Sequence, residues 1–182
     1  MKKYINKASI LKLLSFIPAL FIMSIIFSFS SQDSAESSSL SEQISTYVIE
    51  LLDRLLALDL TELQAVHAVE RIHKFIRKLG HFSEYMLLGV SLSLPLYTLY
   101  HIRGKRLFLA TLCFCIVFAS SDEIHQLFVE GRYGTPKDVL IDTLGAITGI
   151  VSTQLLCYII RKCIIEPLQM HHCTASKCTQ KM

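Results

Sequence analysis

"LFLATLCFCIVFASSDEIHQLF", residues 107–128, joins a long apolar run to a group of polar side chains without a break. The hydrocarbon core of a bilayer is about 30 Å thick, and roughly 20 helical residues cross it. The stretch is long enough to do so, with these polar residues near one membrane face: Asp122, Glu123, His125 and Gln126. Ionisable groups at membrane depth are costly unless they are paired or hydrated. The stretch therefore predicts a membrane helix with a candidate site at its end.

Three other stretches have similar length and apolarity, and the chain of 182 residues is 52% hydrophobic. We expect four membrane-spanning helices, at about residues 10–29, 81–100, 107–127 and 138–160. The first resembles a secretory signal in its basic start, but it is longer than the usual signal and lacks an Ala-x-Ala cleavage site, so we expect it to be retained. The sequence predicts an all-α, polytopic membrane protein with a single domain over residues 1–182.

Lysine and arginine gather before the first predicted span, in "HIRGKR" at residues 101–106, and after the last span. Cytoplasmic loops of membrane proteins carry an excess of these residues. Both termini are therefore predicted to be cytoplasmic, including the tail at residues 161–182. The long loop at residues 31–79 is then extracytoplasmic.

This long loop is predicted to carry two amphipathic helices. It opens with "SSQDSAESSS", a composition typical of turns and irregular chain. Ser39 with Glu42 forms a capping box for the first helix, and Asp59 with Glu62 forms one for the second, which is able to continue into the second span. The two helices either lie on the outer membrane surface or form a lid over an exposed site.

The fourth span has a clear start and a small-residue face. Thr135, Pro136 and Asp138 fit the N-cap, the first helical position and the acid of a capping box. Gly145 and Gly149 form a G-x-x-x-G pattern, which permits a close approach of another helix.

Polar residues of all four predicted spans reach the same level. With a helical rise of 1.5 Å per residue, Asp122 lies roughly 22 Å and Gln126 roughly 28 Å along the third span, in its outer half. The second and fourth spans enter from outside with polar residues in their first turns. Pairs three or four residues apart share a helix face, so these groups can point into the bundle.

Three segments at this level carry a resemblance to a known family. They are "FSSQ" at 29–32, "KLGHFSEYMLLG" at 78–89 and "SDEIHQLFVEGRYGTPKDVLIDTLGAITG" at 121–149. Together they resemble the VanZ-like membrane protein family, over nearly the whole chain from the first span to the fourth. The resemblance implies a bacterial, multi-pass cell-membrane protein linked to glycopeptide (teicoplanin) resistance. It implies no established reaction.

The motifs and the shared level define the candidate site. The candidate catalytic residues are His81, Glu84, Asp122, Glu123, His125 and Asp142. The candidate substrate-binding residues are Ser31, Gln32, Tyr85, Gln126, Arg132 and Asp138.

The first functional hypothesis is a protein that binds or processes a lipid-linked envelope precursor or an anionic lipid at the extracytoplasmic face. Arg132 is suited to hold a phosphate or carboxylate with two parallel hydrogen bonds. His125 and Glu84 are suited to act as general acid and base. The predicted partners are the bilayer and such a lipid, with no nucleic acid.

Three alternatives remain open. The first is a metal-dependent hydrolase with ligands among His81, Glu84, Asp122, His125, Asp138 and Asp142, although no HExxH motif is present, and we assign no metal ligand or cofactor. The second is a small transporter or proton relay, for which four spans are few. The third is a purely structural polar network, in which bases such as Arg132 and Lys137 neutralise the acids.

Overall fold

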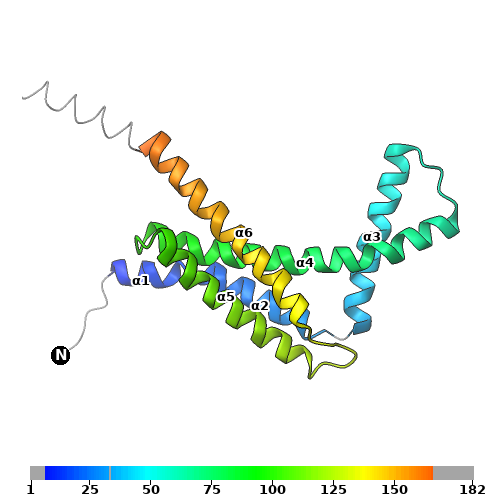
Figure 1. The fold of residues 1–182 in the computed structure, drawn as a ribbon, viewed down its shortest axis with the longest axis horizontal. Helices are drawn as coiled ribbons and strands as arrows, with labels where there is room; N and C mark the ends of the chain where they lie inside the picture. Colours follow the sequence, from blue (N-terminus) through cyan, green and yellow to red (C-terminus); the bar gives the residue numbers. More distant parts are fainter. Residues whose placement is uncertain (1–6, 33, 166–182) are drawn as a thin grey trace, which may run out of the picture.

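The computed structural model describes residues 7–32 and 34–165, and helices dominate this part of the chain (Figure 1). The predicted all-α fold is confirmed. The helices are α1 (Lys7–Leu14), α2 (Ile17–Ser30), α3 (Ser34–Leu56), α4 (Glu62–Thr98), α5 (Gly104–Gln126) and α6 (Pro136–Ile160), followed by a short π-helix at Arg161–Ile165. Most of the predicted cytoplasmic tail lies outside the described residues.

Three helical segments are long and apolar enough to cross a membrane. They are Ser9–Ser30, Gly104–Gln126 and Pro136–Cys163. They coincide with the predicted first, third and fourth spans. This is a membrane protein whose apolar helices face a lipid bilayer.

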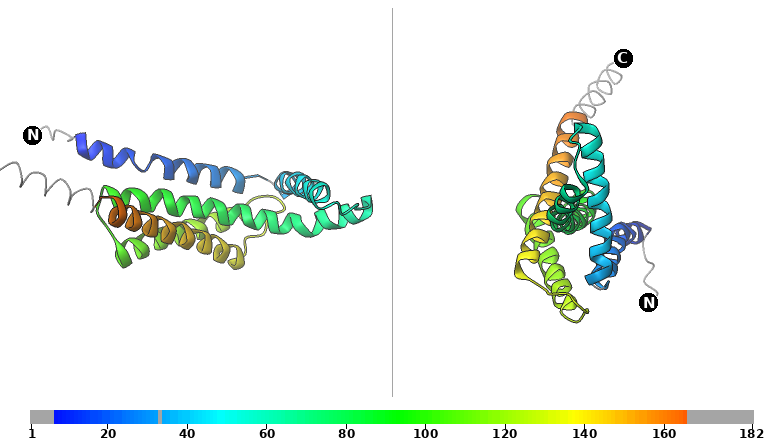
Figure 2. Two further views of the ribbon diagram at one scale, coloured as in Figure 1. Left: turned by 90° about the horizontal axis from the view of Figure 1, so that it is seen from above. Right: turned by 90° about the vertical axis from the view of Figure 1, so that its right-hand side faces the viewer.

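The first span is divided into two helices, whereas the sequence predicted one. Pro18 lacks a backbone N–H, and its ring clashes with the carbonyl of Leu14 in a continuous helix. The chain therefore leaves the helix at Ser15, whose hydroxyl donates to the Lys12 carbonyl at 2.7 Å. The two helices nevertheless continue nearly in line (Figure 2).

The predicted second span is the second half of α4, a single helix of 37 residues with a length of about 55 Å. Serine, histidine and glutamate make this half less apolar than the other three spans, so the crossing by α4 stays a prediction. The helix begins after Thr61, whose N–H donates to the Gln64 side chain at 3.0 Å. The predicted start at Asp59 is wrong, since Asp59 has a φ of 48° in the preceding turn.

Helix α3 begins at Ser34, so the prediction of irregular chain before Ser39 is wrong. It packs across the first half of α4 (Figure 1). Serine hydroxyls are satisfied within the helix, because Ser45 donates to the carbonyl of Ser41 at 2.6 Å. Burial of Ser45 and Ile49 stabilises the helix against the low helix propensity of its serine-rich start.

The bundle is organised around the contact between α4 and α6, the most extensive among the described helices. A Cβ at Gly145 would overlap the Phe82 carbonyl oxygen, and one at Gly149 would overlap the Met86 carbonyl oxygen. The predicted close approach at the G-x-x-x-G pattern is confirmed. It fixes the first polar turns of α6 beside the middle of α4. The buried apolar core between these helices and their neighbours α2 and α5 includes Ile26, Tyr85, Leu88, Cys115, Ala119 and Ala146.

The start of α6 is as predicted in two of its three features. Thr135 is the N-cap, its hydroxyl accepts from the Asp138 N–H at 3.3 Å, and Pro136 is the first helical residue. The capping acid is different, because the Thr135 N–H donates to Glu123 of α5 at 2.7 Å. The interpretation of Asp138 as the acid of a capping box is therefore wrong. Gly134 allows this contact, since a Cβ there would overlap the Glu123 carbonyl.

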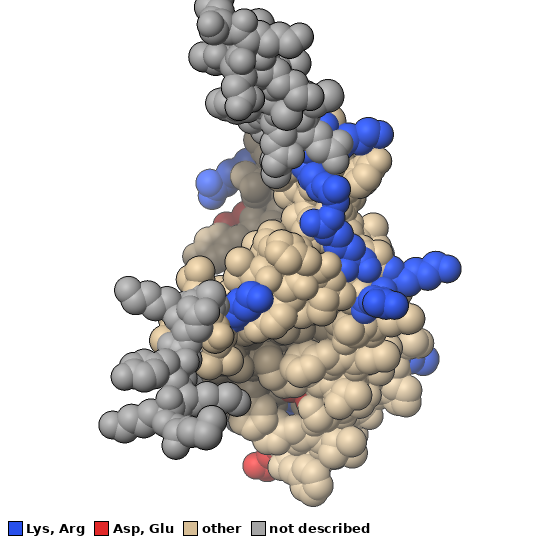
Figure 3. Space-filling view, turned by 90° about the vertical axis from the view of Figure 1, so that its left-hand side faces the viewer, with Lys and Arg blue, Asp and Glu red and all other residues tan. Residues whose placement is uncertain are grey.

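The two ends of the bundle differ in charge. The start of α1, the turn between α4 and α5 and the end of α6 lie at the same end, and Lys and Arg gather there (Figure 3). Two aromatic contacts bind the end together: Lys12 lies over the Tyr100 ring at 5.3 Å, and Arg103 lies over Tyr97 at 5.1 Å. We call it the basic end. The opposite end contains the predicted site, and we call it the acidic end.

Candidate functional site

The acidic end contains a cluster of carboxylates that the bundle buries. Asp122 and Glu123 on α5 and Asp142 on α6 are all buried, with at most 6% of each residue exposed. Asp122 interacts electrostatically with His81, Glu84, Tyr85 and Asp142. Residues of α4, α5 and α6 therefore meet at the depth that was inferred from helix length. We call Asp122, Asp142, His81, Glu84 and Tyr85 the carboxylate cluster.

Asp122 is held by two hydrogen bonds to the same oxygen. The Ser30 hydroxyl at the end of α2 donates to Asp122 Oδ2 at 2.7 Å, and the Gln126 amide donates to it at 3.3 Å. The Gln126 amide also donates to the Ser30 hydroxyl at 3.2 Å. Ser30 was missed by the sequence analysis, which chose Ser31 from the same motif. The sequence shows that Ser30 lies near the outer end of the first span. It does not show that the Ser30 side chain faces α5.

Asp142 is fully buried, and among the described residues neither of its carboxylate oxygens has a hydrogen-bond partner. The nearest cation-forming group is His81, whose Nδ1 lies 3.9 Å from Asp142 Oδ1, too far for a hydrogen bond. The buried Tyr85 hydroxyl also has no hydrogen-bond partner within residues 7–32 and 34–165. An unsatisfied buried polar group costs about 1–3 kcal/mol. The cluster is therefore poorly explained by stability alone.

His125 lies against α2. Its ring stacks on Phe27 with the ring centroids 4.5 Å apart, and its Nε2 lies 3.3 Å from the Ser31 hydroxyl. The two predicted site residues His125 and Ser31 therefore contact each other. Both lie on a more exposed side of the bundle than Asp122.

Arg132 closes the end of α2. Its Nε donates to the Gln32 carbonyl at 3.1 Å, and its Nη2 donates to the Phe29 carbonyl at 2.8 Å. These contacts satisfy carbonyls that a helix C-terminus leaves free, and the cation complements the helix dipole. Burial and the neighbouring Arg77 lower the pKa of Arg132 from its ordinary value, although an arginine stays protonated. Two donors of the predicted phosphate-binding fork are therefore engaged with the backbone.

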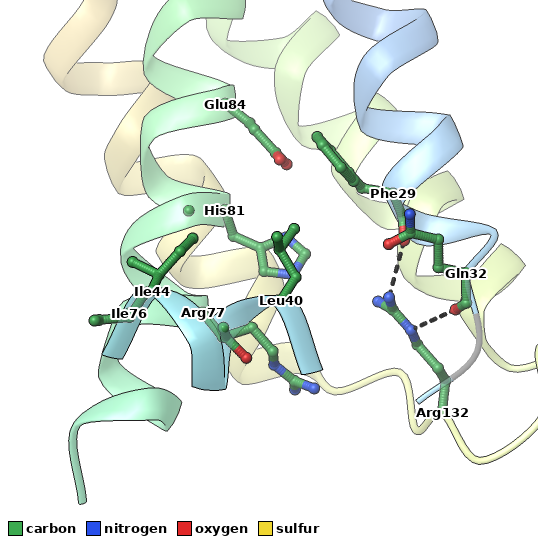
Figure 4. A pocket seen from close by; sticks show the side chains of 11 residues that line it. Phe29, Gln32, Leu40, Ile44, Ile76, Arg77, His81, Glu84 and Arg132 are labelled. Carbon is green, nitrogen blue, oxygen red and sulfur yellow. Dashed lines mark hydrogen bonds between the residues drawn. The ribbon is translucent and has the colours of Figure 1, made fainter. Parts of the chain in front are cut away.

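A cavity of about 210 Å³ opens beside the cluster, between α2, α3, α4 and Arg132 (Figure 4). Its polar lining comes mainly from Arg77, His81, Glu84 and Arg132. Its apolar lining comes from Phe29, Leu40, Ile44 and Ile76. Arg77, His81 and Glu84 project from one face of α4 into it. A cavity of this kind has one end suited to a charged group and a wall suited to a hydrocarbon chain.

The sequence analysis did not name Arg77 among the site residues. The available signal was its spacing, since residues 77, 81 and 84 follow one helix face. A second cavity, of about 300 Å³, shares Arg77 and Arg132 with the first and is lined also by Gln126 and Asp138. The predicted residue Asp138 therefore lies next to the cluster, on the other side of the two arginines.

The family model described as VanZ/LLP1 matches residues 15–161. The chain belongs to the VanZ/LLP1 family. The match spans the three motif segments on which the resemblance rests and all helices of the bundle from α2 to α6. No curated protein matches the chain, and no solved structure matches it.

In this VanZ/LLP1 protein the predicted site residues other than Asp138, which lines the second cavity, form three groups. Asp122, Gln126, Asp142, His81, Glu84 and Tyr85 meet in or beside the carboxylate cluster. Glu123 and Arg132 hold the acidic end together through backbone contacts, with Gln32 supplying one of the carbonyls. His125 and Ser31 form the contact at the α2 terminus.

The arrangement of these groups also bears on metals. Within residues 7–32 and 34–165, no group of three or more His, Cys, Asp or Glu side chains is placed to hold one metal ion. The six residues named above as ligands of a metal-dependent hydrolase belong to two of the three groups or, for Asp138, to the neighbouring cavity. The chemistry that the described geometry offers is proton exchange and hydrogen bonding by His81, Glu84 and the buried carboxylates.

Proposed function

We propose that this protein binds or processes an anionic, lipid-linked cell-envelope molecule at the outer face of the bacterial cytoplasmic membrane. The observation that carries the proposal is the cavity beside the carboxylate cluster. Its charged end and its apolar wall match the two parts of an amphiphile, and proton-exchanging side chains lie at its charged end. A change in the supply or exposure of such a molecule would lower susceptibility to glycopeptides such as teicoplanin.

The charge of the two ends supports the outer face as the place of action. The basic end contains positive residues from the start of α1, the α4–α5 turn and the end of α6, as expected of a cytoplasmic side (Figure 3). The start of α1 and the end of α6 both lie at the basic end, so our proposal includes an even number of membrane crossings. The second half of α4 then supplies the fourth crossing beside the three apolar segments. The carboxylate cluster is at the extracytoplasmic end in this orientation.

The geometry favours His81 over His125 as the proton-exchanging partner of Glu84. His81 and Glu84 both line the cavity, whereas His125 stacks on Phe27 at the α2 terminus. Asp142 Oδ1 lies 3.9 Å from His81 Nδ1, so a small movement would let this carboxyl group accept a hydrogen bond from the imidazole and orient it. If a bond is broken in the ligand, Glu84 and His81 are the general acid and base.

A purely structural network has some support in the contacts of Glu123 and Arg132, both of which tie loops to helix ends. It does not account for Asp142, which is buried without a hydrogen-bond partner among the described residues. A structural tie is expected to satisfy the groups that it buries. We therefore assign structural roles to Glu123 and Arg132 and a functional one to the carboxylate cluster.

The function is tested in a deletion strain, by profiling envelope lipids and teicoplanin susceptibility. The native gene is expected to restore both, and so is Glu62→Gln, which changes an exposed acid at the start of the same helix. Glu84→Gln is expected to restore neither, at an equal amount of protein in the membrane. If Glu84→Gln restores both, the proposed function is wrong.

The orientation is tested separately, by labelling single cysteines with a membrane-impermeant maleimide in intact cells. Tyr133→Cys, in the exposed loop before α6, is expected to react, and His101→Cys, in the α4–α5 turn, is expected to react only after the membrane is opened. The native cysteines are replaced by serine in both variants. The reverse labelling pattern would place the cavity on the cytoplasmic side.

A further inference from the structure

Arg77 lies at the cavity without an anionic partner. Within the described residues it forms no ion pair and no side-chain hydrogen bond. It faces the same cavity as Arg132, and its charge disfavours that of Arg132. Such a grouping of cations around one space is relieved by an anion in that space.

Glu84 restricts the type of anion. Its side chain lines the same cavity from the next helical turns of α4, so in its ionised form Glu84 would repel a fully deprotonated ligand that the arginine attracts (Figure 4). An anion that keeps one proton avoids this conflict, because its O–H donates to the carboxylate. A phosphate monoester has this property, since its second pKa is roughly 6 and part of it keeps a proton near neutrality. A phosphodiester has no such proton.

The size of the cavity restricts the rest of the ligand. At about 210 Å³ it is smaller than typical ligand pockets, which measure about 300–1,000 Å³, so it encloses a headgroup and the first carbons of a chain. Beyond that, Leu40 and Ile44 of α3 and Phe29 of α2 supply apolar surface. Leu40, Ile44 and Phe29 are each more than a third exposed, so a hydrocarbon chain can lie along them.

We propose that this cavity binds a lipid phosphate monoester, with Arg77 as a phosphate-binding residue, Glu84 as the acceptor of the phosphate O–H, and the hydrocarbon chain along Leu40 and Ile44. The inference rests on the proposed function and names the ligand class of the same site. Arg77 supplies the charge-assisted hydrogen bonds that Arg132, engaged with the α2 carbonyls, supplies only in part.

The ligand class is tested on the purified full chain in detergent, by calorimetry with four probes. Dodecyl phosphate is the monoester, methyl dodecyl phosphate is the matched diester, dodecanol lacks the charge and inorganic phosphate lacks the chain. Dodecyl phosphate is expected to bind about 10- to 100-fold more tightly than either the diester or the alcohol, which is the effect of losing a hydrogen bond between charged groups. Inorganic phosphate is expected not to compete with it at millimolar concentration.

Each contrary result with the probes overturns a stated part of the proposal. Equal binding of the diester removes the role given to Glu84. Equal binding of dodecanol means that the cavity recognises only the chain. Competition by inorganic phosphate with the affinity of dodecyl phosphate means that the site takes a soluble anion and no lipid.

Variants test the two residues. Arg77→Gln is expected to weaken dodecyl phosphate about 10- to 100-fold, whereas Arg71→Gln, an exposed arginine of the same helix outside the cavity, is expected to leave it unchanged. Glu84→Gln is expected to remove the preference for monoester over diester. Because Arg77 is exposed, its variant is expected to melt at the native temperature. Native affinity in Arg77→Gln contradicts the inference.

The two proposals fail separately. If Arg77→Gln and Arg71→Gln bind dodecyl phosphate equally while Glu84→Gln still fails to restore the deletion strain, the site is functional and the ligand class is wrong. If Glu84→Gln restores the strain, the proposed function fails whatever the purified protein binds.

Discussion

The two ends of the bundle carry charge in opposite ways. At the basic end, charged groups lie at the surface and rest on aromatic rings, as Lys12 does on Tyr100. At the acidic end, Asp122 and Asp142 lie inside the bundle. The first arrangement keeps the charge in water and uses the aliphatic stem and the ring for contact. The second removes ionisable groups from water, and for Asp142 no described residue donates a hydrogen bond in exchange.

This difference separates charge placed for topology from charge placed for chemistry. Removing a charge at the basic end takes away a small stabilising contact. Removing one inside the acidic end takes away a group whose burial is itself costly. We therefore expect changes at the basic end to alter stability slightly and function not at all. We expect changes in the carboxylate cluster to alter function more than stability.

The largest expected effect comes from breaking the helix contact that joins the two ends. Gly149→Leu places a side chain where even a Cβ overlaps the Met86 carbonyl, so α4 and α6 must separate. Overpacking in a core costs about 1–3 kcal/mol, and a collision with backbone costs at least the upper part of that range. We expect loss of monodisperse protein in size-exclusion chromatography. Thr148→Leu, one residue earlier on an exposed face, is the control and is expected to elute as the native protein does.

The second prediction concerns function without stability. Asp142→Asn keeps the shape of the side chain but removes a carboxylate that is fully buried without a hydrogen-bond partner among the described residues. The melting temperature is expected to stay the same or to rise, because an amide of the same shape never carries the negative charge that is costly to bury. Restoration of the deletion strain's lipid profile is expected to be lost. A lower melting temperature with an intact profile would show that the acidic end is a structural tie.

The general position of the acidic end was predictable from local spacing and charge. Three features of the sequence predicted that polar groups of several helices lie at one depth in the membrane. They are the i,i+4 spacing of Asp122 and Gln126, their distance along an apolar run, and the positions of the basic loops. These are properties of single helices. The family resemblance rested on the same segments and is confirmed by the match over residues 15–161.

What was missed depends on contacts between distant segments. The hydrogen bond from the Thr135 N–H to Glu123 and the one from Ser30 to Asp122 each join distant segments of the chain. The periodicity of a single helix does not predict such contacts. Arg77 became a cavity residue only because α3 packs over α4 beside it. The start of α3 at Ser34 was missed for the same reason, since tertiary packing overrides a serine-rich local preference.

The third prediction tests the hydrogen bond between Ser30 and Asp122, which joins two helices and also holds a carboxylate of the cluster. Ser30→Ala removes the hydroxyl that donates to Asp122 Oδ2 at 2.7 Å and leaves a buried carboxylate with fewer donors. The free energy of unfolding is expected to fall by about 1–3 kcal/mol, seen as a lower melting temperature in detergent. Ser24→Ala is the control, because its exposed hydroxyl only donates to the Leu20 carbonyl within the same helix. Equal melting of the two variants would mean that Ser30 contributes little to holding Asp122.

The smallest effect is expected at the basic end. Arg103→Gln removes a guanidinium that lies 5.1 Å from the centre of the Tyr97 ring. A cation–π contact at an exposed site contributes roughly 0.5–1 kcal/mol, so the melting temperature is expected to fall only slightly. Lipid profile and teicoplanin susceptibility are expected to match those of the native gene.

Lys105→Gln is the matched control for Arg103→Gln, since it removes a positive charge from the same turn, and within the described residues Lys105 lies over no aromatic ring. A lower melting temperature in Arg103→Gln alone assigns the effect to the ring contact, whereas an equal change in both assigns it to net charge. Loss of function in a folded Arg103→Gln protein, inserted in the native orientation, would contradict the division of roles between the two ends. The cysteine labelling of the outer loop separates that outcome from inversion of the protein, because an inverted chain exposes its basic end to the reagent.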